Sequence, residues 1–315
     1  MRLTCLLAGF QLWAVASLNL GTPSRRSLLG GAVAGLANLA PLSLQAVDNT
    51  AVAPILVLGA NGGTGAACVD ECLARSIPVL AGTRTGELKD SRPTSALLSS
   101  LAVDVTSTAS LEAAIKPGLA GVIFAASASK KGGSARDVDR DAVVAAAECC
   151  IKAAVPRFVV VSSGAVTQPG SATYKLLEFV GGGIMSAKLQ GEDRVRALYA
   201  QAPLVERGIG YTIVRPGGLT NEPPVGASLL ELNQGDTKSG RLSRVDVASL
   251  CVASIRSKGS FDTTFECYNA DTAAPVSSVG LSNIMKSQVA TEFKSQFERR
   301  GDSWDTLLAG LSRDS

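Results

Sequence analysis

The stretch ILVLGANGGTG, residues 55–65, decides the fold of this chain. Four apolar residues run directly into a cluster of four glycines, Gly59, Gly62, Gly63 and Gly65, and a segment of helical character follows. A short apolar run that ends in glycine is typical of a buried strand. The glycines after it predict either a tight turn or a place where another chemical group approaches the backbone closely.

The composition of the 315 residues excludes several classes of function. A hydrophobic content of 46% is that of a globular protein, and an aromatic content of 4% argues against a surface that stacks nucleic-acid bases. The sequence contains no histidine, which excludes Ser-His-Asp and Cys-His catalysis. Because imidazole is absent and the seven cysteines form no CxxC pair, we expect no metal site.

The first fifty residues have the character of targeting sequences. Residues 1–17 combine an early arginine, an apolar run and the pattern Ala14-Val15-Ala16, as in a secretory signal peptide. The segment that follows is free of acidic residues, as transit peptides are, and its SRRSLL, residues 24–29, resembles a twin-arginine signal. We therefore expect residues 1–50 to be a leader that directs the protein to the plastid (chloroplast), with a mature chain that begins near residue 47.

Two further points follow from this leader. The twin arginines would add a step to the thylakoid, at its membrane or in its lumen, whereas a single ordinary transit peptide is the alternative. The formal net charge of +3 comes from three arginines ahead of Asp48, and the rest of the chain carries equal numbers of basic and acidic residues. Binding to nucleic acid is therefore not expected.

Segments of strand and helix character alternate along the rest of the chain. This alternation predicts an α/β fold, a doubly wound parallel sheet (Rossmann fold) with a small C-terminal region on the substrate side. We expect this domain to span residues 51–275, to carry a loop-rich segment at 220–242 over the substrate cleft, and to be followed by a helical tail over 276–315. The expected strands are 53–59, 78–84, 101–107, 120–127, 157–166, 210–219 and 263–269, and the expected helices are 62–77, 110–119, 136–155, 184–201 and 243–255.

In this context the glycines form a G-x-x-G-x-x-G pattern between the first strand and the first helix. The first glycine allows the tight turn, the second lets a pyrophosphate approach the backbone, and the third lets helix and strand pack closely. The N-terminus of the helix supplies backbone N–H groups and the positive end of its dipole. The pattern therefore predicts dinucleotide binding, with a purely structural turn as the alternative.

The end of the second strand, LAGTRT at residues 80–85, bears on which dinucleotide is bound. Sites selective for NAD usually carry an acidic residue there, which holds the ribose hydroxyls. Here Arg84 stands at that place, and a guanidinium suits a 2′-phosphate that it grips with two hydrogen bonds. The sequence therefore favours NADP(H) over NAD(H), with a solvated surface arginine as the alternative.

Six motifs occur in a characteristic order: VLGANGGTG (57–65), GTR (82–84), VDVTS (103–107), RFVVVSSGAV (157–166), YTIVRPGGL (211–219) and SRVDVASL (243–250). In this order they resemble the atypical short-chain dehydrogenase/reductases, and among these the NAD(P)H-binding, NmrA-like branch of plant and cyanobacterial chloroplast type. The resemblance covers roughly residues 53–270. It implies a Rossmann fold that binds NAD(P)H, and the branch includes an NADPH-binding subunit of the plastid import machinery.

The resemblance also implies roles for individual residues. Ser163 is implied as the catalytic serine, and Lys188 as the lysine that binds the nicotinamide ribose and assists catalysis. The other residues implied at the cofactor are Gly59, Asn61, Gly62, Gly63, Thr64 and Gly65 at the pyrophosphate, Thr83 and Arg84 at the adenosine phosphate, Asp104 and Val105 at the adenine, Ala125, Ala126, Ser127 and Ser162 at strand ends along the cofactor, and Pro216, Gly217 and Gly218 against the nicotinamide.

One position departs from the family. The catalytic tyrosine of the superfamily lies four residues before the lysine, and position 184 is isoleucine here. The tyrosine hydroxyl is the proton donor of carbonyl reduction, and isoleucine has no proton to give. Tyr174 and Tyr211 are present, but neither has the required spacing.

Two functions therefore stay open on the sequence alone. The first is an NADP(H)-dependent oxidoreductase of a small plastid molecule, in which Ser163, Lys188, water or the substrate supplies the proton. The second is a non-catalytic NADPH-binding redox sensor or assembly factor, which reports to a thylakoid or envelope protein partner. A nucleotide-sugar epimerase, the third reading, also needs the missing tyrosine.

Overall fold

In the computed structural model, residues 52–90, 92, 94–129, 132–201, 203–270, 272–279 and 298–315 are described. The chain divides into two compact units, Met1–Asn49 and Thr50–Ser315, and the described residues all belong to the second. The predicted leader and residues 280–297 of the predicted tail lie outside the described residues.

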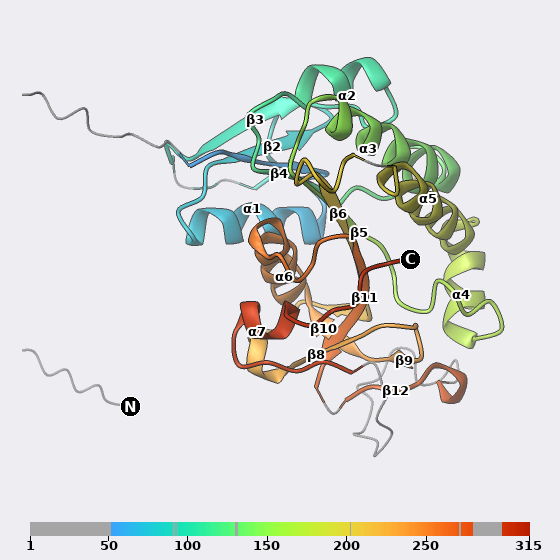
Figure 1. The fold of residues 1–315 in the computed structure, drawn as a ribbon. Coiled ribbons are helices and arrows are strands. Elements are labelled where there is room, and N and C mark those ends of the chain that lie inside the picture. The colour runs from blue at the N-terminus through green and yellow to red at the C-terminus, as the bar shows by residue number, and fades with distance from the viewer. Residues whose placement is uncertain are drawn as a thin grey trace, which may run out of the picture. The chain divides into compact units, whose positions relative to one another are not determined.

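The described residues fold around one eight-stranded sheet with the order β3-β2-β1-β4-β5-β6-β11-β8 (Figure 1). All neighbouring strands pair in parallel except β8, which pairs antiparallel with β11. The predicted doubly wound Rossmann sheet is thereby confirmed. Its strands are β1 Ile55–Leu58, β2 Val79–Thr83, β3 Leu98–Ala102, β4 Gly121–Phe124, β5 Arg157–Val161, β6 Gly210–Pro216, β8 Leu230–Asn233 and β11 Thr263–Asn269.

Helices cover both faces of this sheet, because successive side chains of a strand point to opposite faces (Figure 1). Ile55 and Val57 of β1 belong to the core on the side of α1 and α6, whereas Leu56 and Leu58 belong to the core on the side of α2, α3 and α5. The helices are α1 Gly63–Ala74, α2 Thr108–Ala114, α3 Val143–Lys152, α4 Ala172–Val180, α5 Ile184–Tyr199, α6 Arg244–Arg256 and α7 Trp304–Leu308, and a π-helix, η1 Arg136–Ala142, leads into α3.

Three cysteines are buried where α1 packs against α6. Cys68 and Cys72 lie on α1, Cys251 lies on α6, and the thiols of Cys68 and Cys251 are hydrogen-bonded to each other. Every cysteine in the described part of the chain is both buried and free of disulfides. These thiols act as small apolar side chains in the helix interface.

A small region beyond the sheet is built from short elements. β7 Gly218–Thr220 pairs in parallel with β10 Arg241–Ser243, and β9 Lys238–Ser239 pairs antiparallel with β12 Ala274–Pro275. Two 3₁₀ turns, η2 Ala227–Leu229 and η3 Val276–Ser278, accompany them. The segment expected to be loop-rich therefore holds a full strand, β8, and several short ones.

The third strand differs from its prediction. It occupies Leu98–Ala102 rather than 101–107, because five residues of β2 pair with these five. Asp104 then forms a turn in which its carboxylate accepts hydrogen bonds from the N–H and hydroxyl of Thr106. A side chain that bonds its own backbone two residues on favours a turn over a strand.

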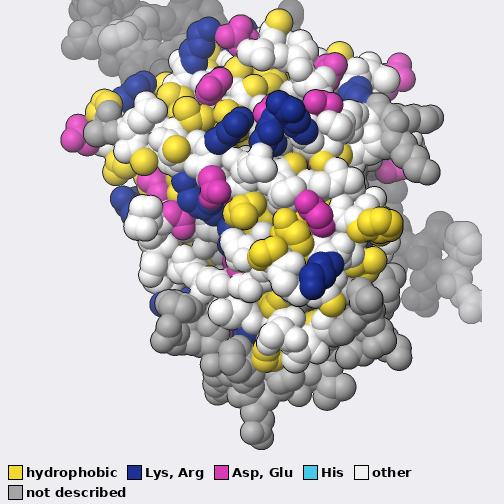
Figure 2. All heavy atoms as spheres, turned by 90° about the vertical axis from the view of Figure 1, so that its right-hand side faces the viewer, with side chains coloured by type: hydrophobic (Ala, Val, Ile, Leu, Met, Phe, Trp, Pro, Cys, Tyr) yellow, Lys and Arg dark blue, Asp and Glu magenta, His cyan; other side chains and the backbone are white. Residues whose placement is uncertain are grey.

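Helix α4 was not predicted. Ser171 caps it by accepting a hydrogen bond from the N–H of Tyr174, and no residue of this helix is fully buried. Its Leu177, Phe179 and Val180 are exposed. Figure 2 faces the side of the molecule on which α4 lies and shows hydrophobic side chains among charged ones.

The described C-terminal residues pack onto the main unit. Among residues 298–315, only Trp304–Leu308 is helical, so the expected helical tail is found there only in part. Leu307 and Leu308 are buried in the core shared with α6. No helix of the described residues combines the length and apolar character needed to cross a bilayer.

Candidate functional site

The turn after β1 requires glycine at two positions. Gly59 has a φ of 86°, and a Cβ there would lie 2.7 Å from the backbone N of Ala126. A Cβ on Gly65 would overlap the carbonyl oxygen of Gly59. The first glycine therefore permits the tight turn, and the third permits helix α1 to pack directly against it.

The N-terminus of α1 faces outward from this turn. Gly62 is the N-cap residue and has no side chain to cap the helix. The side chain of Arg244 lies against the next residue, because a Cβ on Gly63 would be 2.9 Å from its Cδ and Nε. The Arg244 Nη1 donates a hydrogen bond of 2.6 Å to the Oδ1 of Asn221. The start of α1 thus combines uncapped N–H groups with a cation, which suits a pyrophosphate.

A cavity of about 530 Å³ opens beside this turn, at the carboxyl ends of β1, β2 and β4. Strand order reverses between β1 and β4, and such a switch point is where doubly wound sheets bind ligands. The predicted residues that line it are Gly59, Asn61, Gly62, Thr83, Arg84, Val105, Ala125, Ala126 and Ser127. Half of the predicted cofactor residues therefore line this one cavity.

Arg84 links this cavity to a second one of about 520 Å³. The second cavity is also lined by Asp104, Val105 and Asp137. Hydrogen bonds from Thr106, and to a smaller extent the charge of Arg84, hold the pKa of Asp104 below its usual value. Asp104 is thus held in its own turn as a carboxylate, while the exposed Arg84 reaches both cavities.

Lys188 is anchored by an acid that sequence analysis missed. Its Nζ lies 2.8 Å from the Oδ1 of Asp139, whose side chain is fully buried. The Asp139 carboxylate also accepts hydrogen bonds from the hydroxyl of Ser127 and the N–H of Ala128. Asp139 thus joins Lys188 to the wall of the 530 Å³ cavity. The sequence does contain one indication of this role, because Asp139 is an acidic residue among the apolar positions of the predicted helix 136–155.

The π-helix positions Asp139. Within η1 the backbone turn is wider than in an α-helix, a feature often found at functional sites. α5 approaches so closely that a Cβ on Gly191 would lie 2.7 Å from the Asp139 carbonyl oxygen. This close approach puts Lys188 of α5 within reach of Asp139.

Ser163 lies in a different cavity. It lines a space of about 220 Å³ together with Pro216, Gly217 and Gly218, the residues implied at the nicotinamide. Its neighbour Ser162 is buried, and its hydroxyl donates a hydrogen bond of 2.5 Å to Glu192. Ser163 is therefore placed beside a cavity, whereas the hydroxyl of Ser162 is engaged within the protein.

Ile184 packs in an apolar cluster. Together with Tyr174 and Leu189 it lies against the buried residues Ala165, Val166, Met185 and Val276. The side chain at the position of the family tyrosine therefore has no hydroxyl to donate a proton and packs against apolar residues.

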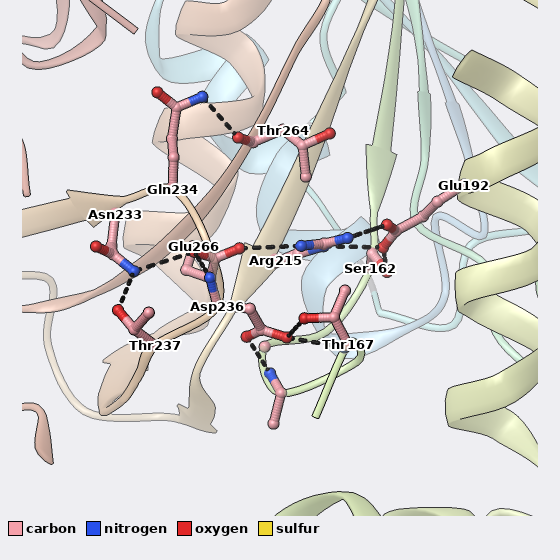
Figure 3. Close-up of polar contacts among 12 residues, drawn as sticks. Ser162, Thr167, Glu192, Arg215, Asn233, Gln234, Asp236, Thr237, Thr264 and Glu266 are labelled. Carbon is pink, nitrogen blue, oxygen red and sulfur yellow. Dashed lines mark hydrogen bonds and ion pairs between the residues drawn. The ribbon is translucent and has the colours of Figure 1, made fainter. Parts of the chain in front are cut away.

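A buried charge network includes two residues that line the smaller cavity, Arg215 and Glu266. Figure 3 shows the contacts of this network. Arg215 donates hydrogen bonds to Glu192, with an Nη2–Oε2 distance of 2.6 Å, and to Glu266, with an Nη1–Oε1 distance of 3.2 Å. Glu266 also accepts from the side chain of Asn233 and from the N–H of Asp236. These contacts tie α5, β6 and β11 to the segment that follows β8.

The two carboxylates of the network differ in pKa. Burial raises the pKa of Glu266, and the charge of Asp236 raises it further, to about 7, although Arg215 opposes the rise. Burial alone would also raise the pKa of Glu192, but the charge and hydrogen bonds of Arg215 outweigh it and hold that pKa below its usual value. Glu192 and Glu266 lie far from Arg215 in the sequence, so no local sequence pattern predicts the network.

The sequence of this chain is similar to those of known proteins over the region that forms the glycine turn and the cavities. A sequence model of the NAD(P)H-binding family matches residues 59–258, from the first glycine of the turn to the end of α6. An uncharacterized chloroplastic protein of Arabidopsis thaliana is 32% identical over 205 residues, which cover 64% of this chain and 71% of that protein. An uncharacterized sugar epimerase of Bacillus subtilis is 29% identical over 223 residues, 69% of this chain and 95% of that protein.

A solved structure shows the same fold. A short-chain dehydrogenase/reductase from Veillonella parvula, in complex with NADP, matches with a TM-score of 0.52 and 17% identity, over 69% of this chain and 94% of that chain. The family match spans the glycine turn, the cavity beside it and the Ser163 region. The chain therefore belongs to the NAD(P)H-binding family.

Proposed function

We propose that this protein is an NADP(H)-dependent oxidoreductase that acts on a small molecule in the plastid. The observation that carries the proposal is the pairing of two cavities along one edge of the sheet. The larger holds the glycine turn and Arg84, and the smaller holds Ser163. In this proposal the dinucleotide binds in the larger cavity, and the molecule that exchanges hydride with it binds in the smaller one.

The residues of the larger cavity fit a dinucleotide phosphate. The absence of a side chain at Gly62 and Gly63 leaves the N-terminus of α1 open to an anion, and Arg244 supplies a positive charge beside it. Arg84, which lines the same cavity, would hold a 2′-phosphate. When bound, the cofactor supplies hydride chemistry, which no side chain of the protein can supply.

The proton needed for carbonyl reduction cannot come from a tyrosine hydroxyl, as it does in the common mechanism of the family. Ile184 cannot donate one, and the ammonium of Lys188 is held by Asp139. Ser163 has its hydroxyl turned to the carbonyl oxygen of Gly164, 3.1 Å away, and can rotate toward a molecule in the smaller cavity. We therefore assign Ser163 to orienting the substrate oxygen, with the proton drawn from water.

The competing function is a non-catalytic NADPH sensor or assembly factor with a thylakoid or envelope partner. The exposed Leu177, Phe179 and Val180 of α4 favour it, because apolar side chains on one exposed helix suit contact with another protein. A sensor, however, needs only the larger cavity. The smaller cavity beside Ser163 therefore favours the oxidoreductase.

The proposed location rests on two observations. The first 47 residues contain no acidic residue and carry the apolar runs of a targeting leader. A relative with 32% identity is chloroplastic. Recovery of the native protein from isolated plastids, with an N-terminus near residue 47, is the expected result. An intact Met1 on the native protein would contradict the targeting proposal.

The test of the activity is a hydride-transfer screen. The mature protein is incubated with NADPH and a panel of small carbonyl compounds, and oxidation of the nicotinamide is followed by its absorbance. Turnover above a cofactor-only control is expected for at least one compound, and it should be lost in Gly62→Val. Tight NADPH binding without turnover on any compound would favour the sensor instead.

A further inference from the structure

The helix α4 forms one edge of the smaller cavity. Thr173 and Leu177 of this helix line the cavity together with Ser163, Pro216 and Leu219. Leu177 is also 36% exposed, so its side chain lies where the cavity meets the solvent. An edge of the cavity that is open to solvent therefore lies against α4.

The face of α4 that lines the cavity continues outside it. Residues three and four apart on a helix lie on the same face, so Thr173, Leu177 and Val180 follow one another along one side of α4. Val180 is 73% exposed and does not line the cavity. An apolar surface thus runs from inside the cavity, over Leu177, to Val180 on the outside.

Phe179 lies on another side of the same helix. It is two residues from Leu177, and side chains two residues apart on a helix do not face the same way. The residue is 88% exposed. Phe179 is therefore apolar and exposed like Val180, but it lies outside the face that leads into the cavity.

The size and the charges of the cavity limit the molecule that it holds. Its volume of about 220 Å³ is below the roughly 300–1,000 Å³ typical of pockets for drug-sized ligands, so a larger reactant would extend past the edge at Leu177. Lys238 and Arg215 line the cavity, but both are buried and held in ion pairs with Glu231 and Glu192. A charged reactant would lose its hydration and compete with these pairs. The lining therefore favours a neutral group.

We propose that the substrate is a neutral, elongated carbonyl compound whose carbonyl end lies in the smaller cavity beside Ser163 and whose apolar chain leaves the cavity over Leu177 and Val180. This inference rests on the proposed oxidoreductase function, because it names the substrate class of that same site. The continuity of the apolar surface with the cavity points to this occupant, since a separate protein partner would not require it. Leu177 and Val180 then set the preference for chain length.

The experiment measures binding of methyl ketones to the cofactor-free mature protein by ligand-observed NMR. Full burial of one CH₂ group strengthens binding by about fourfold. A CH₂ group that lies on the surface of α4, with water on its other side, should contribute about twofold. We therefore expect 2-decanone, which has four more CH₂ groups than 2-hexanone, to bind about tenfold more tightly.

The variants test the path of the chain along α4. Val180→Ser should weaken binding of 2-decanone about three- to fivefold and leave 2-hexanone unchanged. Phe179→Ser is the matched control, because it removes a larger and more exposed apolar side chain from the same helix. It should leave the affinity for both ketones unchanged. Since both positions are exposed, both variants should unfold near the temperature of wild type, which thermal unfolding checks.

Three results would overturn the inference: equal affinity for 2-hexanone and 2-decanone, a loss of 2-decanone binding in Phe179→Ser as large as in Val180→Ser, or tighter binding of the anion decanoate than of 2-decanone. A separate assay of turnover with NADPH keeps the two proposals apart. Binding of 2-decanone that depends on Val180, without reduction of any carbonyl compound, refutes the oxidoreductase and not the path along α4. Reduction of short carbonyl compounds without a gain from chain length refutes the path along α4 alone.

Discussion

Arg84 is the residue on which cofactor choice depends. It follows β2 directly and lines both the 530 Å³ and the 520 Å³ cavity. Its guanidinium can therefore contact the 2′-phosphate of a dinucleotide bound there. Arg84→Ala is expected to weaken NADPH by about 1.5–3 kcal/mol, the net value of a hydrogen bond to a charged group, and to leave NADH nearly unchanged. Calorimetric titration with both nucleotides measures the difference.

The matched control is Arg207→Ala, which removes an exposed arginine that lines neither cavity. It should leave the affinity for both nucleotides unchanged. If Arg84→Ala weakened NADPH and NADH equally, the role of Arg84 at the 2′-phosphate would be wrong.

The glycines of the turn separate binding from folding. Gly62 has a φ of −79°, which any residue adopts, and a Cβ there would lie 3.2 Å from the carbonyl oxygen of Gly59. Gly62→Val should therefore fold but lose dinucleotide binding, because its side chain occupies the place of the pyrophosphate. Gly65→Ala should instead destabilise the fold, since its Cβ meets the backbone of Gly59. Thermal unfolding with and without NADPH distinguishes the two effects, and NADPH binding by a folded Gly62→Val protein would refute the assignment.

At the scale of elements, a buried ion pair between Lys188 and Asp139 joins α5 to η1, beside an exposed one between Arg194 and Asp141. Removing one partner of a buried pair leaves the other charge uncompensated, at a cost of roughly 3–5 kcal/mol. Asp139→Asn is expected to lower the free energy of unfolding by about that amount, because Lys188 is only 12% exposed. Lys188→Met in the same chain should restore most of the loss.

A double-mutant cycle in urea measures this coupling. Additive losses from the two substitutions would show that Lys188 and Asp139 do not act as a pair. Asp193→Asn is a suitable control, since it weakens an ion pair with Arg196 in which the Asp193 side chain is 63% exposed. An exposed pair of this kind contributes about 0–1 kcal/mol.

At the scale of the whole molecule, the network around Arg215 makes stability depend on pH. The pKa of Glu266 is about 7 in the folded protein, above the ~4.3 of an unfolded glutamate. The folded state therefore binds the extra proton, and the stabilisation from Glu266 is complete below the unfolded pKa and is lost as pH rises through about 7. Comparison of wild type with Glu266→Gln should show the stability advantage of wild type shrinking between pH 5 and pH 8.

Urea unfolding across that range checks the prediction. Glu206→Gln, at an exposed position, should run parallel to wild type at every pH. A constant difference between wild type and Glu266→Gln would mean that Glu266 does not titrate in this window.

The sheet and the glycine turn could be predicted from the sequence, because both depend on local patterns. The alternation of strand and helix along the chain is typical of a parallel sheet covered by helices. The spacing of Gly59, Gly62 and Gly65 is set by the turn between one strand and the next helix. Helix α4 escaped prediction because it buries no residue fully, and β8 because it forms an edge within a loop-rich segment.

The supporting residues of the site could not be predicted in this way. Asp139 meets Lys188, and Arg215 meets Glu192 and Glu266, only through contacts between residues far apart in the chain. Arg244 lies in a recognised motif, but its contact with Gly63 depends on how α6 packs against α1. Spacing along the sequence carries no information on such contacts.

The packing of α1 against α6 has a consequence for the chemical reactivity of the thiols. Burial raises the pKa of Cys72 to about 12, and the hydrogen bond to Cys251 together with burial holds the pKa of Cys68 well above its usual value. Alkylating reagents attack thiolates, so these cysteines react only when the two helices separate. The rate of labelling thus reports how often this interface opens. Because α1 begins at the phosphate end of the cofactor cavity, a bound dinucleotide that holds this helix in place should slow the labelling of both its cysteines.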